Sequence, residues 1–437
     1  MPENSFYIET YGCASNKADS YIISNILLES GYIKTKLEEA QFVIINTCAV
    51  KEQTENKIKE RLKSLHHLYY KESNRYIIIA GCLPHITLNY VNVIKTVIPS
   101  FSAIIDLGNF RDLPEIFKRI RLGEKNLIIK SDQMIDKAKF LIKHPIGKIT
   151  CIVPISEGCL GSCTYCCVKH ARVTLNCYDP DNIINNIRHQ LEHGIKQIYL
   201  TSQDCSIYQY GETKLYDLVK EINNLDFKFY LRMGMINPSF LINNVDQLIS
   251  IFNLPKVYQF LHIPIQSGSN RILQEMKRTY EISEIIDNLE LLREKFPYLT
   301  ISTDIICGFP GESEYDFYRT INFIKWLKPE ILNISKFTAR PGTKAKQMTQ
   351  LNSKTIKERS IRLSKVYRAS LLNINDKWKG WEGEVLLLHK GFDDQQTFCR
   401  NFAYKNIFLD KANAVYGEFM KVKVEVIERF NLFGKSV

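Results

Sequence analysis

One pattern occurs three times in the first hundred residues, and it restricts this part of the chain to a parallel α/β sheet. Each copy is a short apolar run followed by a cysteine two or three residues after its end. Helical spacing of apolar residues in 16–28 and 50–68 indicates the intervening helices. Because parallel strands end at one edge of a sheet, where ligands bind, we expect the three cysteines to be neighbours in space. The runs and their cysteines are Phe6–Thr10 with Cys13, Phe42–Asn46 with Cys48, and Tyr76–Ala80 with Cys82.

A second group of three cysteines, Cys159, Cys163 and Cys166, lies in one short glycine-containing loop with the spacing C-x3-C-x2-C. Three thiolates with no obvious fourth ligand predict, for either group, a metal centre with an open coordination position. A closed zinc site is the alternative, with His85 or His170 as the fourth ligand, and spacing alone does not exclude it.

The middle of the chain repeats strand and helix patterns six more times, which predicts a (β/α) barrel or an open portion of one. Residues 105–148, with a short helix near Pro114–Arg121, are interpreted as the passage that leads into it. Since the strand ends of such barrels carry the chemistry, Gln203, Asp204 and Gln266 become candidate site residues. The expected strands are Ile152–Ile155, Gln197–Thr201, Lys228–Arg232, Val257–Ile263, Thr300–Ile306 and Ile331–Phe337. The expected helices are Asp181–His193, Leu215–Asn223, Val245–Phe252, Ile282–Lys295 and Glu314–Leu327.

The composition of the chain limits the number of domains, the cellular compartment and the kinds of partner that we expect. The chain has 437 residues, too many for one core, and 12 cysteines that suit metal binding in a reducing compartment. It has no signal-peptide pattern and no apolar run of about 18 residues, so we expect a cytoplasmic protein with no membrane segment. Ten Lys or Arg side chains stand between 336 and 370 against Glu358 alone, which indicates either a nucleic-acid backbone as partner or a solvated helix face.

The last sixty residues predict short antiparallel strands and hence a small β-barrel. The expected strands are Trp381–Leu388, Thr397–Arg400, Tyr404–Leu409 and Gly417–Ile427.

The loop 158–166 resembles the cluster-binding loop of radical S-adenosylmethionine (SAM) enzymes, and with the upstream cysteines the chain resembles one family, the methylthiotransferases. The similarity covers nearly the whole chain. It also runs through segments 9–20, 46–50, 80–84, 262–269 and 303–312. The resemblance implies an N-terminal α/β domain with an auxiliary cluster over 1–125, a partial (β/α)6 radical SAM barrel over 145–370, and an RNA-binding TRAM domain over 374–437.

This resemblance also implies cofactors and site residues. Two [4Fe-4S] clusters are implied, one that cleaves S-adenosylmethionine to a radical and one that carries the sulfur to be transferred. The first would be held by Cys159, Cys163 and Cys166, and the second by Cys13, Cys48 and Cys82. The candidate cofactor contacts are Tyr165, Gln203, Asp204, Arg232 and Gln266, for which helix capping and water binding are the plain alternatives. The candidate RNA contacts are Arg400, Tyr404 and Lys405.

Segments 166–172, 201–204 and 232–238 resemble the archaeal and eukaryotic branch of the family, although Val173 stands where many relatives carry glycine. That branch acts on tRNA and adds a methylthio group to C2 of N6-threonylcarbamoyladenosine beside the anticodon. An electron donor of the flavodoxin or ferredoxin type is implied, whereas the sulfur donor is left open. The isopentenyladenosine branch and the branch that modifies an aspartate of a ribosomal protein resemble the chain less. A zinc-binding, non-catalytic RNA-binding protein is the alternative from another class.

Overall fold

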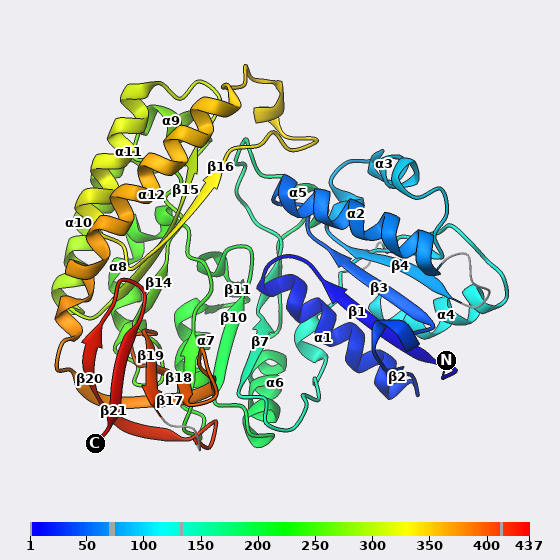
Figure 1. Ribbon diagram of the computed structural model, residues 1–437, viewed down its shortest axis with the longest axis horizontal. Coiled ribbons are helices and arrows are strands. Elements are labelled where there is room, and N and C mark those ends of the chain that lie inside the picture. Colours follow the sequence, from blue (N-terminus) through cyan, green and yellow to red (C-terminus); the bar gives the residue numbers. More distant parts are fainter. Residues whose placement is uncertain (1, 70–74, 132–133, 411–413) are drawn as a thin grey trace. The chain divides into compact units, whose positions relative to one another are not determined.

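The computed structural model describes residues 2–69, 75–131, 134–410 and 414–437 (Figure 1). The chain divides into two compact units, and each is described by itself. The first comprises Met1–Lys143, Ser156–Asp179 and Thr338–Lys346, and the second comprises His144–Ile155, Pro180–Phe337 and Gln347–Val437. Both cysteine groups therefore belong to the first unit. A helix with the length and apolarity to cross a bilayer is absent from the described residues.

The first unit is a six-stranded parallel sheet in the order β2-β1-β3-β4-β5-β6. Its strands are β1 (Ser5–Thr10), β2 (Ile33–Lys34), β3 (Phe42–Thr47), β4 (Tyr76–Gly81), β5 (Ala103–Ile105) and β6 (Leu127–Ile129). Its helices are α1 (Ala14–Glu29), α2 (Glu52–Tyr69), α3 (Tyr90–Val97), α4 (Leu113–Arg121) and the short α5 (Val168–Ala171). The three predicted strands are confirmed, and α4 confirms the short helix predicted near 114–121. The interpretation of 105–148 as a passage is wrong at its start, because β5 and β6 extend the sheet.

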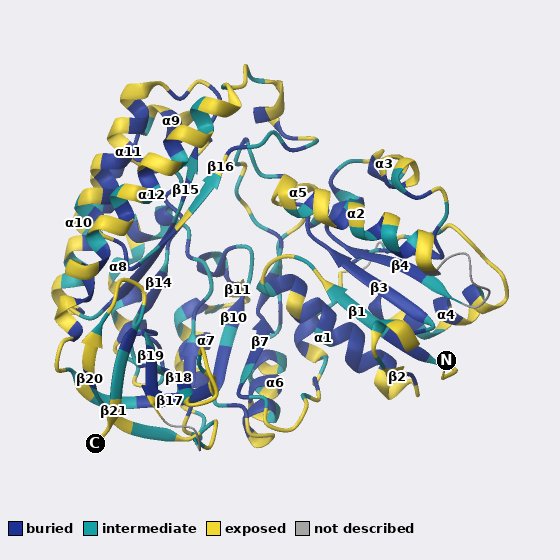
Figure 2. Ribbon diagram, viewed as in Figure 1, coloured by how far each residue is buried: buried dark blue, intermediate teal, exposed yellow. Residues whose placement is uncertain are grey.

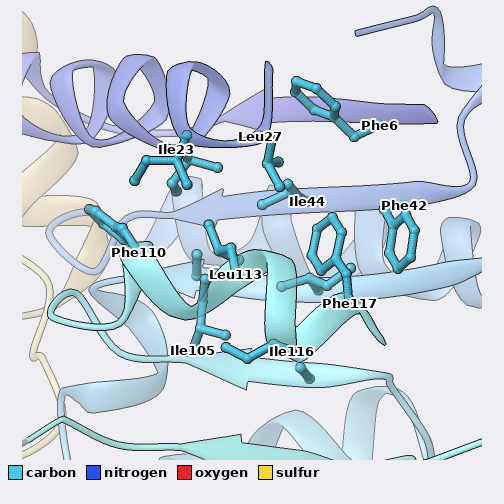
Figure 3. Close-up of a cluster of buried hydrophobic side chains, with 14 of the residues drawn as sticks. Phe6, Ile23, Leu27, Phe42, Ile44, Ile105, Phe110, Leu113, Ile116 and Phe117 are labelled. Atoms are coloured by element: carbon cyan, nitrogen blue, oxygen red, sulfur yellow. The ribbon is translucent and has the colours of Figure 1, made fainter. Parts of the chain in front are cut away.

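Helices cover both faces of this sheet, which explains why β3 is a continuous apolar run rather than an alternating one. In Figure 3, Ile23 and Leu27 of α1 and Phe117 of α4 lie against the strand residues Phe42 and Ile44. The rings of Phe42 and Phe117 are stacked with their centroids 3.9 Å apart. The other face packs against α2 and α3. The sheet is thus fixed on both sides, and its strand ends are held in register.

The second unit contains the six parallel strands that the sequence predicts, in two sheets ordered β13-β10-β7 and β14-β15-β16. The strands are β7 (Thr150–Pro154), β10 (Gln197–Thr201), β13 (Tyr230–Arg232), β14 (Phe260–His262), β15 (Thr300–Cys307) and β16 (Ile331–Lys336). Parallel bridges Leu231↔Val257 and Met235↔His262 join the two sheets between β13 and β14. The result is an incomplete barrel whose edge strands are β7 and β16.

Helices alternate with these strands, as expected for a (β/α) barrel. They are α6 (Pro180–Glu192), α7 (Leu215–Asn223), α8 (Pro238–Phe252), α9 (Asn270–Glu275), α10 (Ile282–Lys295), α11 (Glu314–Leu327) and α12 (Ser353–Asn375). Helix α8 begins seven residues before the predicted start at Val245, and the non-helical backbone of Asn244 marks a kink at that point. The chain also contains two small antiparallel strand pairs. One joins β8 (Ser156–Glu157) to β9 (Asn176–Cys177) in the first unit, and the other joins β11 (Gln209–Tyr210) to β12 (Thr213–Lys214) in the second.

A closed barrel in the order β17-β18-β19-β21-β20 ends the second unit; its strands pair antiparallel except for β19 and β21, which are parallel. Its strands are β17 (Glu382–Lys390), β18 (Gln396–Asn401), β19 (Asn406–Asp410), β20 (Phe419–Ile427) and β21 (Leu432–Ser436). Four of them were predicted, and the missed strand β21 closes the barrel. One apolar cluster joins this barrel to the (β/α) barrel, with Tyr258 and Phe260 on one side and Leu386 and Tyr404 on the other. Figure 2 shows buried residues in β18 and β19 and in the parallel strands β7 and β10.

Candidate cluster sites and cofactor-binding residues

The three upstream cysteines follow adjacent strands of the first sheet. Cys13 follows β1 and is the N-cap residue of α1, while Cys48 and Cys82 come directly after β3 and β4. Since β1, β3 and β4 are neighbours in the sheet, the prediction that these cysteines share one edge is confirmed. Burial raises the pKa of Cys48 to about 11, and the nearby Cys82 and Cys13 add to that rise. Cys13 is exposed, so the group opens outward at this residue.

Buried polar side chains tie together the loops that carry these cysteines. Asn16 Nδ2 donates to Asn46 Oδ1 at 3.2 Å and to the carbonyl of Thr47 at 2.9 Å. Thr47 Oγ1 donates to the carbonyl of Ala80 at 2.6 Å. Gly81 has a φ of +90°, and a Cβ there would lie 2.4 Å from the Thr47 carbonyl, so only glycine fits. Sequence reasoning gave Asn16, Asn46 and Thr47 no role, although the two asparagines stand in the segments that carry the family resemblance.

The second cysteine group occupies the loop between β8 and β9. The backbone N–H of Gly161 donates to Cys159 Sγ at 3.2 Å, as the glycine-containing loop leads one to expect. A Cβ at Gly161 would lie 3.3 Å from Cys159 Sγ and 3.8 Å from Cys163 Sγ, so both sulfur atoms lie beside this glycine. Burial raises the pKa of Cys166 to about 12. Val173 is exposed, so its branched side chain does not crowd the loop.

The two histidines that the sequence offers as fourth zinc ligands lie against backbone carbonyls. Nowhere in the described parts of the chain do three Cys, His, Asp or Glu side chains converge closely enough to hold one metal ion. His170 Nε2 instead lies 3.1 Å from the carbonyl of Gly342. His85 Nε2 lies 3.5 Å from the carbonyl of Ile105.

A buried ion network joins the two cysteine-bearing regions. Arg172, just after α5, pairs with Asp19 at 2.6 Å and with Glu157. Lys137 pairs with the same two carboxylates at 2.8 and 2.9 Å. Burial alone would lower the pKa of Arg172, but Glu157 and Asp19 outweigh it and hold that pKa well above its ordinary value. The network fixes the loop of the second cysteine group against α1 of the first.

Arg172 also reaches one of the predicted cluster ligands. Burial raises the pKa of the Cys82 thiol, and the Arg172 guanidinium, which lies in hydrogen-bonding contact with it, acts in the opposite direction. Cys167 makes a second link, because its Sγ donates to the carbonyl of Ala49 at 3.2 Å. Arg340 Nε donates to the same carbonyl at 2.9 Å. Cys167 therefore packs beside Ala49, the residue that follows Cys48.

Three of the predicted cofactor contacts, Gln203, Asp204 and Gln266, follow strands of the (β/α) barrel, while Tyr165 is a half-buried residue of the cysteine loop. Asp204 is buried, and its Oδ1 accepts from the backbone N–H groups of Ser206 at 3.0 Å and Asn237 at 3.3 Å, so it holds two strand-end loops together. Burial raises its pKa. Gln266 has a φ of 71° and exchanges backbone hydrogen bonds with β15. The half-buried Gln203 stands next to Asp204.

Sequence reasoning missed a polar pair in the same barrel. His262 Nε2 lies 2.8 Å from Asp304 Oδ2, and the two side chains come from the neighbouring strands β14 and β15. Both side chains are about a quarter exposed. Both residues stand in segments that carry the family resemblance, and that resemblance could have drawn attention to them. Their contact could not be predicted from the sequence, because the two residues are far apart in it.

The fifth cofactor candidate and the RNA candidates lie together in the seam between the two barrels. The Arg232 guanidinium is 4.4 Å from the ring centroid of Phe260 and 4.8 Å from that of Tyr404. Arg400 lies 3.7 Å over the same Tyr404 ring and donates to the Tyr199 hydroxyl.

Lys405, which lies in the same seam, is also removed from the surface. Its Nζ donates to Asn375 Oδ1 at 2.7 Å, and burial lowers its pKa to about 8. RNA contact by Arg400, Tyr404 and Lys405 therefore stays a prediction that this packing does not support. In the structure these side chains fasten the C-terminal barrel to the (β/α) barrel.

Comparison with known proteins agrees with this architecture. The model of the radical SAM superfamily matches residues 153–324, and that of the "Uncharacterized protein family UPF0004" matches residues 5–99. The solved methyltransferase TsrM from Kitasatospora setae, with cobalamin and a [4Fe-4S] cluster bound, aligns with a TM-score of 0.56 over 78% of this chain and 73% of its own, at 12% identity. An incomplete (β/α) barrel with a three-cysteine cluster loop defines a radical SAM enzyme.

Relatives with higher sequence identity show which family of radical SAM enzymes the chain belongs to. The "Probable threonylcarbamoyladenosine tRNA methylthiotransferase" of Pyrococcus horikoshii is 35% identical over 99% of each chain. The "Threonylcarbamoyladenosine tRNA methylthiotransferase" of Homo sapiens is 32% identical over 96% of this chain and 71% of its own. This chain belongs to the family of threonylcarbamoyladenosine tRNA methylthiotransferases.

Proposed function

We propose that this protein adds a methylthio group to C2 of N6-threonylcarbamoyladenosine beside the anticodon of tRNA. The reaction is that of its relatives, and the cofactors are S-adenosylmethionine and two [4Fe-4S] clusters. The observation that carries the proposal is that two separate three-cysteine groups stand in one compact unit, each with backbone and side-chain support for its loop.

The residues divide into two sets of ligands and a set of supports. Cys159, Cys163 and Cys166 hold the cluster that acts on S-adenosylmethionine. Cys13, Cys48 and Cys82 hold the auxiliary cluster. When bound, these groups supply the radical and the sulfur for the transfer.

The chain itself orients and shields these groups. Arg172 places a positive charge beside Cys82, which favours the thiolate that iron requires. Asp204 holds two strand-end loops of the barrel in place, and the His262–Asp304 pair offers a polar contact inside it. Tyr165, Gln203, Arg232 and Gln266 remain candidate contacts of the cofactor. The TRAM identity of the C-terminal barrel, an electron donor of the flavodoxin or ferredoxin type and a cytoplasmic location belong to the same proposal.

Nucleoside mass spectrometry of tRNA tests the substrate. Deleting the gene should abolish 2-methylthio-N6-threonylcarbamoyladenosine and leave N6-threonylcarbamoyladenosine in its place, and the wild-type gene should restore the product. Unchanged product after deletion rejects the proposal. Loss of a methylthio group from isopentenyladenosine or from a ribosomal-protein aspartate would instead assign the chain to another branch. Anaerobically reconstituted protein should contain about eight irons per chain. Stoichiometric zinc without iron would favour the non-catalytic alternative.

A further inference from the structure

A groove with a volume of about 690 Å³ lies between helix α12, strand β16 and the turn that joins β20 to β21. All of these elements belong to the second unit. We call this surface the α12 groove. Its polar lining consists of Lys336, Ser360, Ser364, Lys365, Arg368 and Arg429, and the rest of the lining is aliphatic. No carboxylate lines the groove.

The cations of this groove are not neutralised by the protein. In the part of the chain that the structure describes, no ion pair involves the side chains of Lys336, Lys365, Arg368 or Arg429, since the pairs formed there use other residues. The main chain of Arg429 is held, because its carbonyl accepts from Asn375 Nδ2 at 3.0 Å. Four positive charges thus face one groove, and none of them forms an ion pair with a described residue.

Other cations of the same helix behave differently. Arg359 pairs with Glu312 at 2.7 Å, and Arg362 pairs with Glu314 at the start of α11. On α12, Arg359 and Arg362 therefore form ion pairs within the protein, whereas Lys365 and Arg368 are available to an external anion.

The chemistry of the groove fits the sugar-phosphate backbone of RNA. Phosphate oxygens are bound mainly by Lys, Arg and hydroxyl side chains, and the groove presents four cations with the hydroxyls of Ser360 and Ser364. The helical stretch from Ser360 to Ala369 spans about 14 Å, at 1.5 Å per residue. The four cations come from three elements, namely β16, α12 and the turn between β20 and β21, so they are distributed over the groove, which suits several phosphates better than one small anion.

The position of the groove connects the C-terminal barrel with the reactive edge of the (β/α) barrel. Lys336 is the last residue of β16, at the end of the strands where such barrels carry their chemistry. Arg429 belongs to the C-terminal barrel and is held beside Asn375, the last residue of α12. Figure 1 shows α12 running beside β16 and down to β20 and β21. Since β16 is an edge strand, no further strand covers this side of the barrel.

We propose that the α12 groove binds the phosphate backbone of the tRNA substrate and leads it from the C-terminal barrel toward the strand ends. The identity of the RNA rests on the proposed function. The inference is compatible with the packing of Arg400, Tyr404 and Lys405 in the seam, because it places RNA contact at Lys365, Arg368 and their neighbours instead.

The test compares two charge-matched double variants of the full-length, reconstituted protein. Lys365→Gln with Arg368→Gln removes two groove cations. Lys220→Gln with Lys325→Gln removes two exposed cations from α7 and α11, outside the groove. Binding of tRNA that carries N6-threonylcarbamoyladenosine is measured by fluorescence anisotropy between 50 and about 200 mM KCl. Circular dichroism and iron content verify that each variant is folded and loaded.

The groove variant should bind tRNA about tenfold more weakly, and the slope of log K against log salt should become shallower by about 2, one for each lost phosphate contact. The control variant should keep the wild-type affinity and slope. Wild-type binding by the groove variant overturns the inference, and so does an equal loss in both variants. Loss of binding to anionic vesicles with tRNA binding intact would overturn it as well, in favour of a lipid partner.

Failure of the groove and failure of the proposed function give different results. If wild-type protein methylthiolates tRNA but the groove variant binds tRNA normally, only the groove inference fails. If the groove variant loses tRNA binding but the loaded wild-type protein makes no methylthio product, the proposed function fails and the groove stands as an RNA-binding surface.

Discussion

Replacing Asp19 by asparagine removes one carboxylate from the buried ion network while keeping the shape of the side chain. Lys137 and Arg172 would then share Glu157 alone, so the four-residue set changes from neutral to a net charge of +1. The side chains of Asp19 and Lys137 are each 2% exposed and that of Arg172 is 3% exposed, so water does not screen the excess charge.

The expected cost follows from this burial. Breaking a buried pair costs about 3–5 kcal/mol, whereas an exposed pair contributes about 0–1 kcal/mol. Since about 1.4 kcal/mol corresponds to a factor of ten, amide exchange in α1 should accelerate by at least about 100-fold. The matched control is Glu60→Gln in the exposed pair with Lys63, whose side chains are 72% and 54% exposed. It should change exchange in α2 by less than about fivefold.

Hydrogen exchange followed by mass spectrometry of the reconstituted protein at pH 7 provides the measurement. Exchange of α1 in Asp19→Asn within fivefold of wild type would refute the reasoning, because the network would then not stabilise this region. The dependence on pH adds a second check. Burial raises the pKa of Asp19, but Lys137 and Arg172 outweigh it and lower that pKa below its ordinary value.

A carboxylate with a lowered folded pKa stabilises fully above its unfolded pKa of about 3.9, and this stabilisation is lost as the pH falls through the folded value. The difference between wild type and Asp19→Asn should therefore stay constant from about pH 5 to 8 and shrink only below about pH 4.

Further predictions concern the clusters and the seam between the barrels. Cys163→Ala should abolish cleavage of S-adenosylmethionine, while Cys48→Ala should preserve cleavage but stop methylthio formation; equal loss of cleavage would contradict the division between the clusters. Gly161→Ala brings a Cβ to 3.3 Å from Cys159 Sγ, so the iron content should fall from about eight toward about four per chain, and full iron content would count against the tight loop. Burial lowers the pKa of Lys405 to about 8 from 10.5, so the unfolded state binds more protons between these values and stability should rise with pH there. Urea unfolding followed by tryptophan fluorescence should show this rise in wild type and not in Lys405→Met, and a rise of the same size in both would exclude Lys405 as its source.

Much of the fold could be predicted because its signals are local. The apolar runs that form β1, β3 and β4, and helices such as α7 and α10, are written in the spacing of neighbouring residues. The short strands β5 and β6 were missed, since three apolar residues are too few to distinguish a strand from a loop. Strand β21 was missed for a different reason: Gly434 interrupts its apolar pattern, and its pairing with β19 and β20 fixes it in the barrel.

The candidate site divides in the same way. The six cysteines could be found from their positions after strands and within one loop. The support of Cys82 by Arg172 could not, because Arg172 and Asp19 are 153 residues apart in the sequence and meet only in the folded unit. The RNA candidates Arg400 and Lys405 have the right residue types, but the sequence does not tell whether a cation faces water or a seam.

By itself, the sequence determined the alternation of strands and helices, the placement of two cysteine trios at ligand-binding positions and, through its motifs, the family. Periodicity and spacing are properties of neighbouring residues, so they can be interpreted without coordinates. The tertiary structure decided which charged side chains form ion pairs inside the protein and which stay available for a partner. Arg172 and Arg359 are buried in ion pairs, whereas Lys365 and Arg368 line a groove whose described lining contains no Asp or Glu. The reason is that burial and counter-charge depend on neighbours in space, which residues distant in the sequence supply.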